Sequence, residues 1–186
     1  METAVQTSIN KTVTLKNDDK VVIRHMRPED NQSSFDFFKS LSPQDRKYLR
    51  VDVTNWENVE RRFQHTGAGR VERLVVVDGD EIVGDGALEL SGHGWGEKIG
   101  EIRLIIAGRY QRTGLGAKLA RELLLLAAQH KLSRIVARLM KPQIGAHKIL
   151  HYLGFHEEFE LPDMVLDQSG NWQDMIIMRC NLEDLW

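Results

Sequence analysis

Hydrophobic positions recur along this chain with two different periods, and these periods predict an order of strands and helices. Apolar residues at alternate positions, or in short runs between turn residues, predict strands, whereas recurrence every three or four positions predicts helices. The helix pattern occupies residues 28–41, 43–50, 56–65, 114–130 and 144–153. The strand pattern occupies residues 21–26, 74–77, 81–90, 98–107, 134–140, 155–161 and 174–181, with a further short strand at 12–16. This order is typical of an α+β or mixed α/β fold with a mostly antiparallel sheet.

Two of the predicted helices show a clear apolar face. In the helix at 114–130, leucines 115, 119, 123 and 126 share one side, and Lys118, Arg121 and Glu122 lie off it. In the first helix, Phe35, Phe38 and Leu41 form the corresponding face. We expect both faces to pack against the sheet.

Composition indicates one globular domain. The chain has 186 residues, of which 41% are hydrophobic and 28% charged, and no repeat or Pro/Gly/Ser-rich linker divides it. We therefore expect a loose tail at residues 1–11 and a single domain over residues 12–186. The oligomeric state is not readable from these features.

Charge and cysteine content exclude several classes of function. The formal net charge is −2, and no run of Lys or Arg forms a basic patch, which argues against nucleic-acid binding. The single Cys180 excludes an internal disulfide framework and a multi-cysteine zinc site. The N-terminus lacks the pattern of a secretory signal, and the longest apolar run, residues 123–128, is too short to cross a membrane. These observations favour a cytoplasmic protein with no membrane partner.

The most informative segment passes from a strand through a turn with two glycines into the long helix. Gly114 and Gly116 lie where that helix begins, and Arg109 and Arg112, close before them, are expected to add positive charge at the mouth of this site. The first N–H groups of a helix have no internal partner and lie at the positive end of its dipole, so they can bind a phosphate. The alternative is a helix start eased by glycine, with solvated arginines. Leu119 breaks a G-x-G-x-x-G dinucleotide motif, and no Gly-Lys-Ser/Thr P-loop is present.

Two motifs in this chain resemble those of the GNAT superfamily of N-acetyltransferases. The run Q-R-T-G-L-G at residues 111–116 is similar to the family signature Q/R-x-x-G-x-G/A. The run A-H-K-I-L-H-Y-L-G-F at residues 146–155 is similar to a later motif, in which a helix ends in Gly-Phe before a strand. The order of elements from residue 21 to residue 181 also resembles that of the family. The resemblance implies a mostly antiparallel sheet of six to seven strands flanked by helices.

The resemblance also implies a co-substrate and the residues that bind it. Acetyl-CoA, or another acyl-CoA, is the acyl donor in this family, and no metal is required. The pantetheine arm is expected in a wedge between the strands at 98–107 and 134–140, paired with the backbone of Leu104, Ile105 and Ile106. The pyrophosphate is expected on the amides of Gln111, Arg112, Thr113, Gly114, Leu115, Gly116 and Ala117.

Glu101 is the candidate general base. It lies about 10 Å before Leu104 along an extended strand, a separation that one bridging water can span. An amine acceptor must lose a proton before it attacks a thioester, and a nearby carboxylate can accept that proton. The run E-I-R-L-I-I at residues 101–106 resembles that of some bacterial protein lysine acetyltransferases. The alternative is a structural ion pair with Arg103 or another cation.

The residue at the expected general-acid position differs from the family pattern. Leu150 stands where many members carry a tyrosine five residues before the phenylalanine of Gly-Phe, and Tyr152 is about 200° further round the helix. His151 could serve instead, or the CoA thiolate could leave without an acid. The missing tyrosine also keeps a second hypothesis open, a CoA-binding sensor without turnover. The intact glycine pair argues against a purely structural domain.

The acyl acceptor is left open by the sequence. Glu89, Glu97 and Glu101 lie near the expected entrance and would suit a cationic amine, such as a protein lysine or a polyamine, unless they are merely solvated. Trp95 could line that entrance. His147 and His151 share a helix face, but no third ligand makes them a metal site. Cys180 has the pattern of a buried small residue rather than a nucleophile.

Overall fold

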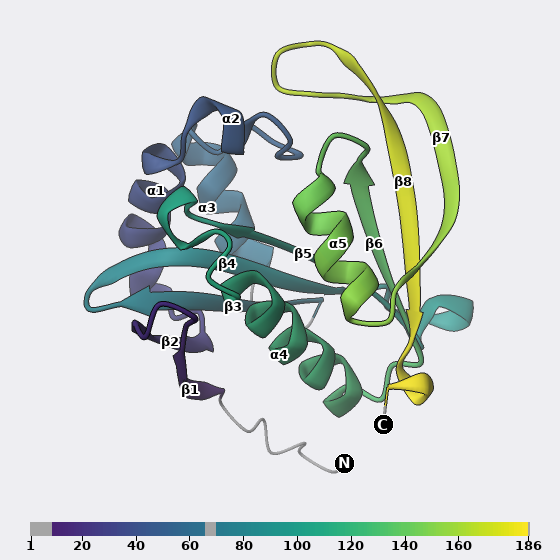
Figure 1. Cartoon of the computed structure of the whole chain (residues 1–186), viewed down its shortest axis with the longest axis horizontal. Coiled ribbons are helices and arrows are strands. Elements are labelled where there is room, and N and C mark those ends of the chain that lie inside the picture. The colour runs from purple at the N-terminus through teal and green to yellow at the C-terminus, as the bar shows by residue number, and fades with distance from the viewer. Residues whose placement is uncertain (1–8, 66–69, 186) are drawn as a thin grey trace.

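The protein folds around one eight-stranded sheet with helices on both faces (Figure 1). The structure is a computed structural model that describes residues 9–65 and 70–185. All neighbouring strands are antiparallel except β5 and β6, which are parallel. The strands, in the spatial order β1-β2-β3-β4-β5-β6-β8-β7, are β1 (Asn10–Thr14), β2 (Lys20–His25), β3 (Val71–Asp78), β4 (Glu81–Leu90), β5 (Ile99–Ile106), β6 (Arg134–Met140), β7 (His156–Leu166) and β8 (Trp172–Asn181).

Two groups of helices cover the two faces of the sheet. On one face, α4 packs on β3, β4 and β5 and contacts α5, and these helices lie in front in Figure 1. On the other face, α1 contacts β4 and α3. A buried apolar cluster fills each of the two interfaces. The helices are α1 (Asn31–Ser40), α2 (Pro43–Arg46), α3 (Trp56–His65), α4 (Leu115–Gln129) and α5 (Ile144–Tyr152).

The structure confirms the predicted α+β class and most element positions, with differences at the two sheet edges. The sheet has eight strands rather than six or seven. β1 starts at Asn10, so the end of the predicted loose tail belongs to a strand. Residues 1–8 lie outside the described residues, as does the Gly-Ala-Gly segment 67–69 that is expected to end the helix at 56–65. β7 continues past Pro162 to Leu166, beyond the predicted end at residue 161. It is an edge strand with register shifts, where a proline is tolerated because no further strand needs its N–H.

The predicted apolar faces are confirmed with two exceptions. The α4 leucines 115, 119, 123 and 126 are all buried against the sheet. Glu122 is also buried, because its carboxylate accepts a hydrogen bond from Lys11 Nζ of β1 at 2.7 Å. In α1, Phe37 is buried beside Phe38, whereas Phe35 is partly exposed and packs edge-on against Trp56 of α3.

The sheet divides between its two central strands. β5 pairs with β6 only over Ile99, Gly100 and Glu101, opposite Arg134, Ile135 and Val136, whereas its ladder with β4 continues to Ile106. Beyond Glu101, β5 therefore has one edge that pairs with no described strand. This opening places a free strand edge in the middle of the molecule.

A buried charged cluster joins α3 to the sheet beside this opening. Asp85 of β4 accepts hydrogen bonds from Arg62 of α3 at 2.7 Å and from Arg73 of β3 at 2.8 Å. Burial alone would raise the pKa of Asp85, but the two guanidiniums outweigh burial and lower it. Burial lowers the pKa of Arg62 to about 10. Asp85 is therefore the charge that allows two arginines to lie inside the protein.

We predict that Asp85→Asn destabilises the fold by roughly 3–5 kcal/mol, because it leaves two buried guanidiniums without their counter-charge. Urea unfolding followed by circular dichroism measures this loss. Glu81→Gln is the control, since Glu81 pairs with Arg109 in an exposed ion pair and should cost less than about 1 kcal/mol. An equal effect of the two substitutions would contradict the assigned role of Asp85.

The same cluster predicts a pH dependence. The folded protein lowers the pKa of the Asp85 carboxyl below its ordinary value of 3.8. The ionised carboxylate therefore stabilises the fold in full above pH 3.8, and this stabilisation is lost as the pH falls through the lowered pKa.

Candidate functional site

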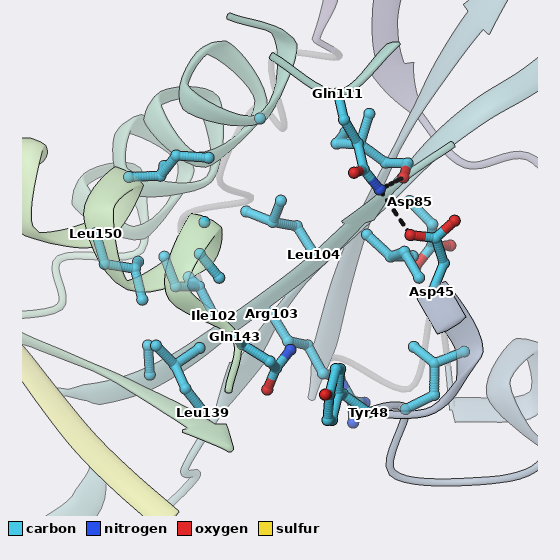
Figure 2. A pocket seen from close by; sticks show the side chains of 18 of the residues that line it. Asp45, Tyr48, Asp85, Ile102, Arg103, Leu104, Gln111, Leu139, Gln143 and Leu150 are labelled. Carbon is cyan, nitrogen blue, oxygen red and sulfur yellow. Dashed lines mark hydrogen bonds between the residues drawn. The ribbon is translucent and has the colours of Figure 1, made fainter. Parts of the chain in front are cut away.

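A groove of about 1730 Å³ occupies the opening between β5 and β6. Its lining comes from both halves of the sheet, from the start of α4, from α5 and from the segment between α2 and α3 (Figure 2). One half of the groove lies against glycines and backbone at the start of α4, and the other lies over charged side chains of β3, β4 and β5. We call these the glycine half and the arginine half.

The first turn of α4 presents unpartnered N–H groups to the glycine half. Gly114 is the N-cap residue, with φ +88°, and no side chain caps the helix. In this turn, the Lys118 N–H donates to the Gly114 carbonyl at 3.2 Å. The N–H groups of Leu115, Gly116 and Ala117 therefore have no acceptor four residues before them. Such N–H groups, together with the helix dipole, can in principle hold an anion.

Gly114 and Gly116 occupy positions of this turn that disfavour a side chain. A Cβ atom at Gly116 would lie 3.0 Å from Ile149 Cδ1 of α5, so this position is tightly packed between two helices. The positive φ of Gly114 is a conformation that other residues rarely adopt.

Basic side chains surround the same turn, and one of them was not predicted. Arg112, Lys118 and Lys16 line the groove, and the Lys16 N–H donates to the Thr113 carbonyl at 3.0 Å. Lys16 lies in the β1–β2 hairpin, far from the glycines in sequence, so no local pattern could place it there. The prediction that Arg109 contributes at this mouth is wrong, because Arg109 binds Glu81 at 2.7 Å and lies outside the lining.

The free edge of β5 forms the floor between the two halves. Leu104, Ile105 and Ile106 line the groove, as do Gln111, Gly116 and Ala117. Gln111 Nε2 donates to the Ile106 carbonyl at 3.2 Å and to Asp45 Oδ1 at 2.8 Å (Figure 2).

Two of the predicted binding residues do not present their side chains to the groove. The Thr113 hydroxyl donates to the Tyr110 carbonyl at 2.6 Å, and the Leu115 side chain is buried in the core. Neither residue is part of the lining. Only their backbone groups are therefore candidates for contact with a ligand.

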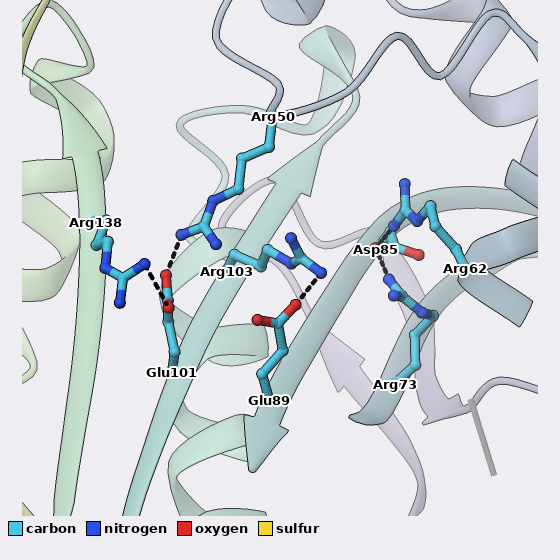
Figure 3. Close-up of polar contacts among 8 residues, drawn as sticks. All are labelled: Arg50, Arg62, Arg73, Asp85, Glu89, Glu101, Arg103 and Arg138. Carbon is cyan, nitrogen blue, oxygen red and sulfur yellow. Dashed lines mark hydrogen bonds and ion pairs between the residues drawn. The ribbon is translucent and has the colours of Figure 1, made fainter. Parts of the chain in front are cut away.

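Glu101 lies on β5 at the base of the arginine half, between two guanidiniums. Its Oε1 is ion-paired with Arg50, from the segment between α2 and α3, and its Oε2 lies 3.5 Å from Arg138 Nη1 of β6 (Figure 3). Arg103, named as a possible partner, binds Glu89 instead. Arg50 and Arg138 line the groove, whereas Glu101 lies behind them, with 12% of its side chain exposed.

Other residues singled out in the sequence lie elsewhere. Trp95 is fully exposed and Glu97 is exposed, and neither is part of the lining, so the predicted entrance does not form there. Leu150 is buried in the groove wall, and His151 lies outside the lining. Tyr152 and Tyr48 both line the groove. Tyr152 lines the groove although it lies about 200° round the helix from Leu150, where the family tyrosine is expected. No pattern in the sequence predicts that Tyr48 lies here.

The surroundings of Cys180 and of the α5 histidines do not indicate a nucleophile or a metal site in the described residues. Cys180 is buried, and burial raises the pKa of its thiol to about 11. His147 Nε2 lies 3.1 Å from Glu157 Oε2. Over residues 9–65 and 70–185, no three His, Cys, Asp or Glu side chains gather in a metal-binding arrangement. Within the same described part of the chain, no helix is long and apolar enough to cross a membrane.

Comparison with known proteins identifies the family. The sequence profile of the Acetyltransferase (GNAT) family matches residues 30–155, more than half of the chain. The chain therefore belongs to the GNAT family of N-acetyltransferases, enzymes that use acetyl-CoA as acyl donor. A comparison with curated protein sequences gives no match.

Solved structures share the fold at low sequence identity. The GNAT domain of S. lividans PAT has a TM-score of 0.77 and 14% identity, with 92% of this chain and 96% of that chain covered. Mycobacterium smegmatis RimJ, solved with CoA-disulfide, has a TM-score of 0.79 and 18% identity, with coverage of 95% and 88%. A spermidine N-acetyltransferase chimera from Vibrio cholerae SpeG and hSSAT has a TM-score of 0.74 and 20% identity, with 89% of this chain and 97% of that chain covered. The fold is thus shared by differently named proteins at 20% sequence identity or less.

We predict that CoA raises the melting temperature of the protein and that Gly116→Val abolishes most of this shift. A ligand at 100 times its Kd stabilises a protein by about 2.7 kcal/mol. A valine at position 116 would press on Ile149 of α5 and displace the α4 amides that line the groove. A thermal titration with CoA, supported by calorimetry, measures both effects.

Gln129→Val is the matched control, because Gln129 is exposed at the other end of the same helix and outside the groove. Its CoA affinity should equal that of the original protein. Unchanged affinity in a folded Gly116→Val variant would show that the cofactor binds elsewhere.

Proposed function

We propose that this enzyme transfers an acetyl group from acetyl-CoA to a primary amine, with both substrates bound together in the groove. The observation that carries the proposal is the uncapped start of α4 at one end of the unpaired edge of β5. The pyrophosphate would bind the N–H groups of Leu115, Gly116 and Ala117, beside Lys16, Arg112 and Lys118. The pantetheine arm would extend along Leu104–Ile106 towards the arginine half, where the amine binds.

In the reaction, the amine nitrogen forms a bond to the thioester carbonyl carbon, and the C–S bond then breaks. The amine proton passes to Glu101 through a bridging water, and the electron pair of the broken bond leaves on the CoA sulfur. Backbone N–H groups of β5 in the Leu104–Ile106 segment would stabilise the oxyanion that forms on the carbonyl oxygen. The acceptor is a protein lysine or a small amine.

The arrangement around Glu101 is compatible with a base that acts through water. An ionised carboxylate has about four lone-pair positions, and Arg50 and Arg138 approach one oxygen each. The remaining positions can accept a hydrogen bond from a water between the two guanidiniums. Arg50 and Arg138 would thus position the carboxylate without occupying all of its acceptor sites.

We predict that Glu101→Gln lowers kcat by roughly 10²–10⁴ at neutral pH, the usual contribution of a general base, while CoA affinity changes only a few-fold. The deficit should shrink as the pH rises, because the free amine then loses its proton in solution. Steady-state kinetics over a pH series, with CoA release as the signal, measure this behaviour.

Glu97→Gln is the control, since Glu97 is an exposed carboxylate outside the groove lining and should leave kcat unchanged. A normal rate in Glu101→Gln at neutral pH would remove Glu101 as the base while leaving acetyl transfer intact. Tight CoA binding without transfer to any amine would instead favour the CoA-binding sensor.

A further inference from the structure

The arginine half carries more positive than negative charge. Five arginines and three carboxylates form a charged layer over β3, β4, β5 and β6, in three neighbouring ion-paired groups (Figure 3). The layer therefore has an excess of two positive charges, in a protein whose formal net charge is −2. Its members are Arg50, Arg62, Arg73, Asp85, Glu89, Glu101, Arg103 and Arg138.

Each carboxylate in this layer is already paired with arginine. Arg62 and Arg73 bind Asp85, Arg103 binds Glu89, and Arg50 and Arg138 flank Glu101 (Figure 3). The expectation that Glu89, Glu97 and Glu101 create a site for a cationic amine therefore does not fit this geometry. A polyamine or a lysine in a basic sequence would meet guanidiniums rather than carboxylates.

Three of the arginines have N–H groups to offer a ligand. Arg50, Arg103 and Arg138 line the groove, with 37%, 37% and 50% of their side chains exposed. In the contacts of the described chain, each reaches a carboxylate through one terminal nitrogen, whereas a guanidinium has five N–H donors.

The pKa of Arg103 is lowered by burial and partly by the positive charge of its arginine neighbours. Burial lowers this pKa, Glu89 raises it, and the neighbouring Arg50 and Arg73 lower it. A ligand carboxylate beside these guanidiniums would therefore relieve their mutual repulsion.

Next to this layer, the turn between β7 and β8 is hydrogen-bonded to the segment between α2 and α3, and these contacts form a bridge between two parts of the chain. At the turn between β7 and β8, the Gln168 N–H donates to the Lys47 carbonyl at 2.9 Å, and Gln168 Nε2 donates to the Leu49 carbonyl at 2.7 Å. Lys47 Nζ also lies 3.4 Å from Asp167 Oδ2. Leu49 directly precedes Arg50, so the bridge crosses beside the arginine layer. This bridge favours a small acceptor over the surface of a folded protein.

We propose that the acceptor is a small amine that also carries a carboxylate, of the amino-acid class, and that Arg50, Arg103 and Arg138 bind this carboxylate. The inference rests on the proposed acetyl transfer and specifies its acceptor. Bidentate contact between a guanidinium and a carboxylate would fix the amine at a set distance from the thioester.

The test compares matched acceptors in the full-length enzyme. Each amino acid in a panel is paired with the amine obtained by replacing its carboxylate with hydrogen, and spermidine and a lysine-rich folded protein are included. The measured quantity is the ratio of kcat/KM for the two members of each pair. A ratio taken within one enzyme cancels general effects on folding or on Glu101.

We expect the carboxylate-bearing member to be preferred by about 10- to 100-fold, the range for a charged hydrogen bond, and Arg138→Gln to remove most of this preference. Arg138 is the variant of choice because its side chain is half-exposed and its 3.5 Å contact with Glu101 is long. Arg134→Gln is the matched control on the same strand, since Arg134 binds Glu183 and lies outside the groove. Its ratio should stay unchanged.

The possible failures are distinguishable. Transfer to amines with no preference for the carboxylate, or with a preference for spermidine or the folded protein, would overturn this inference and leave acetyl transfer in place. If the preference for the carboxylate-bearing acceptor survives in both Arg138→Gln and Arg103→Gln, these arginines do not bind the acceptor carboxylate. Absence of transfer to every amine would overturn the proposed function and the inference together.

Discussion

The short ladder between β5 and β6 is the constraint on which the rest of the site depends. Parallel pairing ends at Glu101, although both strands continue, and a groove opens where further hydrogen bonds would otherwise form. Backbone polar groups left without partners inside a protein are costly unless water or a ligand satisfies them. A ligand with its own amide groups can replace the missing strand. The same separation brings the start of α4 and the charged layer to opposite ends of one floor.

Strand register explains why so many arginines gather at the other end of that floor. Glu89 and Glu101 lie directly opposite each other on β4 and β5, so their side chains share a face of the sheet. Like charges in such a pair are destabilising. Arg103 compensates one carboxylate, and Arg50 and Arg138 compensate the other. Arginine is suited to this task because its planar fork reaches several oxygens while its hydrocarbon stem packs along the sheet.

The sequence alone predicts the parts of this protein that local patterns encode. The α4 leucine spacing, the glycine pair at residues 114 and 116, and the alternation along β5 indicate a helix, an anion site and the face occupied by Glu101. Lys16 and Arg50 could not be predicted, because each reaches the site from a segment distant in sequence. The second partner of Glu101, Arg138, depends on the register between β5 and β6, which no local pattern specifies. Burial of Glu122 escaped prediction for the same reason, since Lys11 comes from another strand.

The order of strands divides the sheet into two units that meet at the groove. β1 to β5 follow one another as neighbours, whereas β6, β8 and β7 form a separate three-stranded unit. Each unit is built mainly from pairings between strands close in sequence, and such contacts form with a small loss of loop entropy. The units are joined by three residue pairs between β5 and β6, by contacts of α4 with α5, by the Arg138–Glu101 ion pair and by the hydrogen bonds of Gln168. A cofactor bound between the two strand units would therefore contact both of them. Its binding would couple the unfolding of the two units, which share only a short stretch of backbone pairing.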